Sequence, residues 1–231
     1  DPGLDRRFKA IGWRLNQFRK AISVAREARP DADLNVWITE HARGVNLKMG
    51  NGMHRASLTS NVDATVSTAD FLIGVASIPE IKGAFWHGVN AGPWQLFDAS
   101  VKHRDLRPTP VYWGLRVLRS VLLDHTVAVE VSQSAISGYA GGYDVSAAGF
   151  RDEQASQFGV WISNRRQGRT PAEVRLPKLA GQRVELRQFE LSDGSAAGSP
   201  NTAFTEDYYL NIEPDVTIVT VNDDGGIPLT L

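Results

Sequence analysis

The chain has 231 residues, of which 42% are hydrophobic and 22% charged, the composition of an ordinary folded protein with one large or two unequal domains. Its 25 basic and 26 acidic residues are spread along the sequence and leave a formal net charge of -1, so there is no basic footprint for a nucleic-acid backbone. Cysteine is absent, which excludes disulfides and thiolate chemistry but leaves the cellular compartment open. No apolar run indicates a membrane span.

Helices and buried strands alternate in the first half of the chain. Apolar residues recur at steps of three and four in the helical segments, and short continuous apolar runs mark the strands. The pattern predicts, in chain order, a helix over 5–28, a strand over 34–40, a helix up to about residue 78, a strand over 81–89 and a helix beginning at Thr109–Pro110. This order is typical of a parallel α/β sheet or barrel, and two strands cannot form that sheet alone.

From His125 onward the pattern changes to short strands separated by Gly, Asn, Asp and Pro. The predicted strands are 126–131, 158–163, 173–176, 184–191, 208–212 and 216–221. Residues 134–149 are rich in Gly, Ala and Ser and are interpreted as a long surface loop. The second half is therefore predicted to be an all-β sandwich.

Glu40 closes the first predicted strand, just before the polar segment that begins at His41. The carboxyl ends of the strands form the catalytic edge of an α/β barrel. A carboxylate at this edge has two interpretations: a structural ion pair or cap, or a nucleophile or general base.

Aromatic and imidazole side chains lie near Glu40 in the predicted topology. Trp86 ends the second strand and Trp94 follows in the next loop, where each ring either stacks on a sugar or packs within the protein. His87 either donates to a sugar hydroxyl or to Glu40, or is a structural group. His41 either orients Glu40 or binds substrate hydroxyls, or else it is a solvated loop residue.

Metal and nucleotide chemistry find no support in the sequence. His41, His54 and His87 do not fall at a metal-ligand spacing, so no metal is predicted. The glycines near residue 140 lack the spacing and the strand-to-helix context of a phosphate-binding loop. We therefore expect no cofactor.

Several local sequences together resemble one enzyme family. They are Trp37-Ile38-Thr39-Glu40, Phe85-Trp86-His87, the segment 107–115, Ser163-Asn164-Arg165, Pro200-Asn201-Thr202 and the terminal run 227–231. This series resembles the carboxyl-terminal half of α-L-arabinofuranosidases of glycoside hydrolase family 51, which belong to a clan of retaining glycosidases built on a (β/α)8 barrel. The resemblance is diffuse but spans nearly the whole chain.

The resemblance implies a division into two parts. Residues 1–123 look like the last strands and helices of the catalytic barrel, and residues 124–231 look like an appended, jelly-roll-like β-sandwich. Glu40 matches the family's nucleophile by position, although Thr39 precedes it and His41-Ala42 follow it where the family has an acidic or similar residue and Trp-Asn. The family's acid/base, an Asn-Glu pair, matches no position in this sequence.

The implied protein acts on a carbohydrate and needs the amino-terminal part of the barrel, which carries the acid/base. The first residues of the chain look cut rather than like a signal peptide, and a homo-oligomer is left open. Alone, the chain is expected to be inactive and prone to associate.

Other functions remain compatible with these residues. They are a β-xylosidase-like, glucuronidase-like or endoglucanase-like member of the same clan, a non-catalytic β-sandwich that binds carbohydrate or only stabilises the barrel, and a relative that has lost its chemistry.

Overall fold

The computed structural model describes residues 2–42, 62–89, 96–98, 107–132, 145–164, 171–188 and 215–230. The expected strand over 208–212 lies outside these ranges. Three α-helices are described, α1 (Pro2–Ala28), α3 (Val62–Ala76) and α4 (Pro110–Val121), with a short 3-10 helix, η2 (Pro177–Leu179). The strands are β1 (Val36–His41), β2 (Ile81–Trp86), β3 (Phe97–Asp98), β4 (Arg107–Pro108), β5 (His125–Val127), β6 (Val145–Arg151), β7 (Phe158–Asn164), β8 (Pro171–Arg175), β9 (Arg183–Gln188), β10 (Asp215–Thr220) and β11 (Gly226–Thr230). Helices and antiparallel sheets thus occur together, as the sequence predicts.

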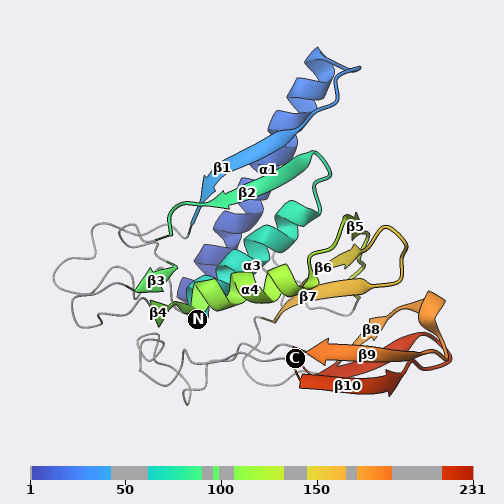
Figure 1. Ribbon diagram of the computed structural model, residues 1–231. Coiled ribbons are helices and arrows are strands. Elements are labelled where there is room, and N and C mark those ends of the chain that lie inside the picture. The colour runs from blue at the N-terminus through green and yellow to red at the C-terminus, as the bar shows by residue number, and fades with distance from the viewer. Residues whose placement is uncertain are drawn as a thin grey trace.

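β1 and β2 form a parallel two-stranded sheet, and α1 and α3 lie behind it in Figure 1. The first hydrophobic core lies between this sheet and the two helices. Leu15 and Ile22 enter it from α1, Ile38 from β1, and Val75 and Ile78 from the end of α3 and the residues after it. The three-and-four spacing in the first helix therefore predicted its buried side correctly.

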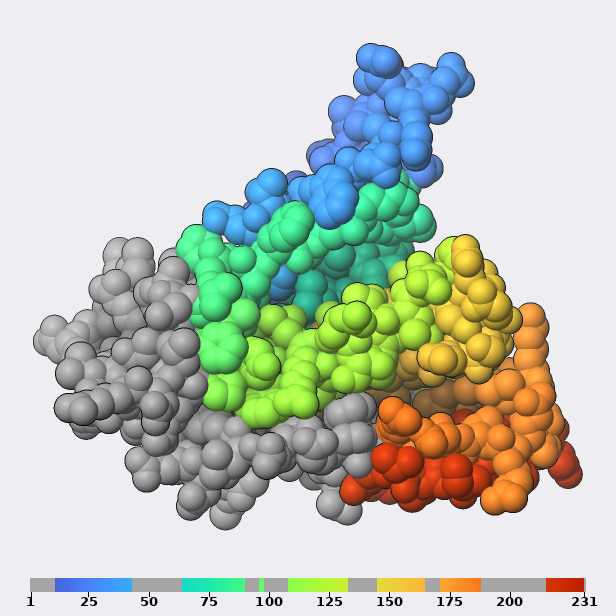
Figure 2. All heavy atoms as spheres, in the orientation of Figure 1, coloured from blue at the N-terminus to red at the C-terminus, as the bar shows by residue number. Residues whose placement is uncertain are grey.

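The opposite face of β1 and β2 is left uncovered by the helices that the structure describes, which corrects the prediction of two buried strands. Trp37 and Phe85 are each 54% exposed, and their rings stack with centroids 5.7 Å apart. Gly83 leaves room for the indole, because a Cβ there would lie 2.5 Å from a ring carbon of Trp37. Figure 2, in the same orientation, shows both strands at the front surface.

The second half contains antiparallel strands in three groups. β5, β6 and β7 form one sheet in that order, β8 pairs with β11, and β9 pairs with β10. The prediction of a loop over 134–149 is wrong for its last residues, since β6 begins at Val145. Small residues of β6 fit beneath a helix, where Ala148 and Phe150 are buried, and this packing produces a strand despite low β-propensity.

A second hydrophobic core joins the helices to the antiparallel sheet. Ala69 and Ile73 of α3 pack with Ala148 and Phe150 of β6 and Trp161 of β7, and side chains of α4 pack against the same cluster. Two buried cores therefore lie on the two sides of α3, one shared with β1 and β2 and the other with β6 and β7.

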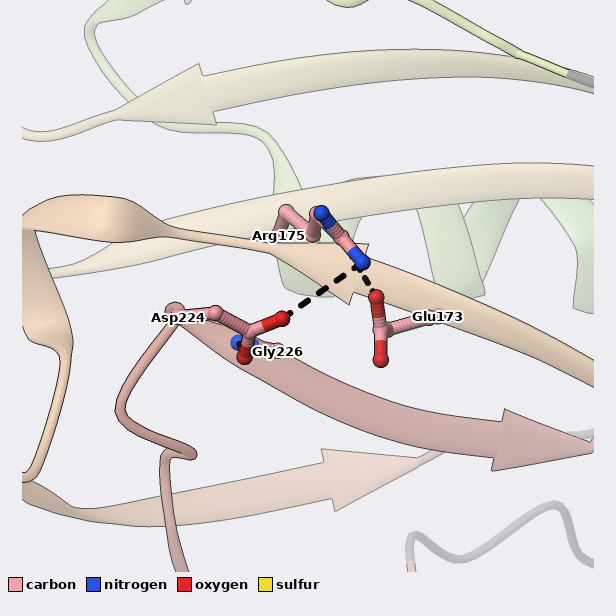
Figure 3. A network of polar contacts seen from close by, with 4 residues as sticks. All are labelled: Glu173, Arg175, Asp224 and Gly226. Carbon is pink, nitrogen blue, oxygen red and sulfur yellow. Dashed lines mark hydrogen bonds and ion pairs between the residues drawn. The ribbon is translucent and has the colours of Figure 1, made fainter.

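Polar contacts connect β6 to α3 and also occur on the β8–β11 pair. Ser146 Oγ of β6 donates to Asp70 Oδ1 of α3 at 2.5 Å, and Asp70 is only 9% exposed. On the β8–β11 pair, Arg175 bridges Glu173 and Asp224 while Gly226 N donates to Asp224 Oδ1 (Figure 3). Arg175 is well exposed, so these ion pairs orient a turn and add little stability.

None of the helices in the described ranges is long and apolar enough to cross a membrane.

Candidate active site

Glu40 owes its exposure to an irregularity in the pairing of β1 with β2. Ile38 pairs with Ala84 and His41 pairs with Trp86, so β1 advances three residues while β2 advances two. Regular alternation would place Glu40 on the buried side with Ile38. The extra residue instead leaves Thr39 and Glu40 both exposed and turns His41 inward. Bulges of this kind are common beside active sites, where they re-aim a side chain.

The Glu40 carboxylate is held by one imidazole. His87 Nδ1 lies 2.7 Å from Glu40 Oε2, a hydrogen bond that becomes an ion pair when the imidazole is charged. The Glu40 side chain is 66% exposed and that of His87 is 33% exposed. The contact therefore orients the carboxylate without enclosing it, and Glu40 remains open to a ligand.

His41, the next residue after Glu40, contacts two aromatic rings. The centroid of its ring lies 5.3 Å from the ring centroid of Phe71 of α3. It lies 5.3 Å from that of Trp86 of β2, with the two rings edge to face. Burial lowers the pKa of His41 to about 4, because the charged imidazolium would lose its hydration. At neutral pH the site therefore holds a neutral imidazole directly after Glu40.

The backbone ladder continues past the end of β2. His87 N donates to His41 O at 3.1 Å, so the residues that carry the two imidazoles are fixed to each other. Farther along, Leu96 N donates to Val89 O at 2.9 Å, and Thr109 N donates to Leu96 O at 2.8 Å. Thr109, the N-cap of α4, is thereby tied to the segment that follows β2.

The structure brings together four of the five residues singled out in the sequence. Glu40, His41, Trp86 and His87 lie at the carboxyl end of the β1–β2 sheet. Trp94 lies outside the described residues. His41 is a packed, partly buried residue rather than a solvated loop residue, because the bulge turns it toward α3.

Sequence reasoning missed Phe71, which supports His41 from α3 and contacts Phe18 of α1. Phe71 lies on an apolar face of α3, and its sequence pattern therefore indicates core packing but not proximity to the candidate site. No group of three or more potential metal ligands occurs among the residues that the structure describes.

Comparison with known proteins shows that the fold of this chain is similar to that of solved structures. The sequence matches no protein-family model and no curated protein. The crystal structure of α-L-arabinofuranosidase from Thermotoga maritima in complex with arabinose aligns with a TM-score of 0.68 and 13% identity. A second crystal structure, of an arabinofuranosidase, aligns with a TM-score of 0.62 and 13% identity.

Each alignment covers 96% of this chain and 46% of the solved chain. The chain therefore spans about half the length of the solved proteins that it resembles, and it corresponds to the carboxyl-terminal part of their fold. At 13% identity the likeness concerns the fold alone.

Proposed function

We propose that the chain is the carboxyl-terminal half of a retaining glycoside hydrolase of the α-L-arabinofuranosidase type, with Glu40 as its nucleophile. One observation carries the proposal: in a fold resembling arabinofuranosidases, a carboxylate stands exposed at the carboxyl end of a parallel strand and is oriented by a neighbouring imidazole. This is the edge where α/β barrels carry their catalytic groups.

The reaction needs two carboxyl groups about 5 to 5.5 Å apart. A Glu40 oxygen attacks the anomeric carbon while an acid protonates the departing glycosidic oxygen, so that one carbon–oxygen bond forms as the other breaks. Water then hydrolyses the glycosyl–enzyme ester, with the former acid acting as base. We assign that acid to the part of the fold that this chain does not span.

The proposed substrate is a terminal arabinofuranosyl unit of a plant-type polysaccharide or oligosaccharide. The pair of Glu40 and His87 would face the sugar, with Trp86 and His41 forming the floor beneath it. Trp94 would contribute an aromatic face from the following loop.

The uncovered face of β1 and β2 fits this incomplete barrel. Trp37 and Phe85 would lie in the barrel interior. Within the described residues β1 and β2 pair only with each other, so further strands could pair at their outer edges. In this proposal residues 1–123 belong to the barrel and residues 124–231 form the appended β-sandwich.

The test uses the chain together with the polypeptide that completes the barrel, either fused or mixed. Hydrolysis of an aryl α-L-arabinofuranoside should fall at least about 1,000-fold in Glu40→Gln, because the amide is a poor nucleophile. Glu130→Gln, at an exposed glutamate after β5, is the matched control and should retain activity. Activity that survives Glu40→Gln would refute the assignment.

A further inference from the structure

Glu40 has two carboxylate oxygens, and the contact with His87 distinguishes them. His87 Nδ1 lies 2.7 Å from Oε2. We propose that His87 is a positioning residue that holds Oε2 through its Nδ1–H, so that Oε1 is the oxygen that attacks the sugar. This inference rests on the proposed function of Glu40 and assigns different roles to its two carboxylate oxygens.

The backbone fixes both partners before any substrate arrives. The bulge of β1 sets the direction of Glu40, and the hydrogen bond from His87 N to His41 O at 3.1 Å ties residue 87 to the end of that strand. Below, His41 packs against Phe71 and Trp86. A backbone hydrogen bond and aromatic packing thus support the residues next to the pair, the kind of support that holds reacting groups in a defined geometry.

The chemistry of the contact fixes the tautomer of His87. An ionised carboxylate can only accept hydrogen bonds, so Nδ1 must carry the proton whether the imidazole is neutral or charged. The contact therefore requires the Nδ1–H form of His87 for as long as Glu40 is ionised. Next to the pair, His41 is kept neutral by burial and adds no competing charge at neutral pH.

A residue that orients the nucleophile differs measurably from one that binds a sugar hydroxyl. Loss of orientation lowers kcat, because the attacking oxygen is misdirected in the transition state, whereas loss of a hydroxyl contact present throughout the reaction raises KM. His87 is also about one-third exposed, so its replacement should leave the core cluster that contains Ile38 intact.

The first experiment needs no enzymatic activity. Long-range nitrogen–proton NMR of the 15N-labelled chain at pH 8 should show neutral His87 as the Nδ1–H tautomer, and the Glu40→Ala variant should shift it toward the Nε2–H form that free histidine favours. His125, an exposed histidine of β5, is the internal control. An Nε2–H tautomer of His87 in the wild-type chain would overturn the inference.

The second experiment uses the completed enzyme. Replacing His87 by Leu should lower kcat about 10- to 100-fold, the value of a hydrogen bond to a charged group, and leave KM within about threefold. His87→Asn keeps a donor near the Nδ1 position and should recover most of the lost rate. His125→Asn should behave as wild type.

The outcomes separate the two proposals. A rise in KM with kcat unchanged, or equal loss in the Leu and Asn variants with native circular dichroism, would overturn the positioning role while Glu40 remained the nucleophile. Retained activity in Glu40→Gln would instead overturn the proposed function itself.

Discussion

Replacing Gly159 by Ala should strongly destabilise the protein by separating α4 from β7. A Cβ at this position would overlap the carbonyl oxygen of Val121 and lie 2.9 Å from its carbonyl carbon and 3.1 Å from its Cα. All three are backbone atoms at the end of α4, so no rotamer change relieves the overlap. Overpacking typically costs about 1 to 3 kcal/mol, and a clash between backbones belongs at the upper end, about 3 kcal/mol.

The assay is chemical denaturation of the wild-type and Gly159→Ala chains, followed by tryptophan fluorescence. Gly181→Ala is the matched control: Gly181 has a φ of +71°, but a Cβ added there would meet no atom within 4 Å, so only the left-handed backbone is penalised, by about 1 kcal/mol. Equal or smaller destabilisation in Gly159→Ala than in Gly181→Ala would refute the close packing of α4 on β7.

Two further predictions concern polar groups that are buried wholly or in part. The pKa of His41 is about 4 in the folded chain and about 6.5 when unfolded, so between these values the unfolded chain binds a proton that the folded chain does not. The free energy of unfolding is therefore unaffected by protonation of His41 above pH 6.5 and falls as the pH drops toward 4. Between pH 7 and pH 4.5, the free energy of unfolding measured in urea should therefore fall by about 2 to 3 kcal/mol more in the wild type than in His41→Phe. An equal fall in both proteins would contradict the desolvation of this imidazole. Ser146→Ala removes the donor to buried Asp70 and should lower the free energy of unfolding by about 1 to 2 kcal/mol. Ser156→Ala removes a similar hydrogen bond to Asp152 from an exposed serine and should cost clearly less. Equal costs would argue against a stabilising contact between Ser146 of β6 and Asp70 of α3.

The sequence predicts the helices and parallel strands of the first half well, because their apolar spacing reflects one buried side. The stripe through Leu15 and Ile22 needs only periodicity to be recognised. The uncovered face bearing Trp37 and Phe85 could not be predicted from local pattern, since an apolar strand looks the same whether or not a partner covers it.

β6 shows a different limit of local reasoning. Its Ala and Gly residues resemble a loop, and only their packing with Ala69 and Ile73 of α3, far away in the sequence, explains the strand. This tertiary contact overrides a weak local preference.

At the candidate site, the sequence predicts which residues gather but not how they are arranged. The strand ends bring Glu40 close to His87, as parallel topology requires. The bulge that exposes Glu40 and turns His41 inward depends on the register between two strands, which single-strand patterns do not contain. Phe71 is likewise recognisable only once α3 is seen against His41.

The most direct test of Glu40 as the nucleophile is to trap the covalent intermediate in the completed enzyme. Incubation with an activated 2-fluoro-arabinofuranoside, which slows hydrolysis of the glycosyl ester, followed by proteolysis and mass spectrometry, should find one sugar attached to the peptide that contains Glu40. A sugar attached to another carboxylate, or hydrolysis with inversion and no labelled peptide, would contradict Glu40 as the nucleophile.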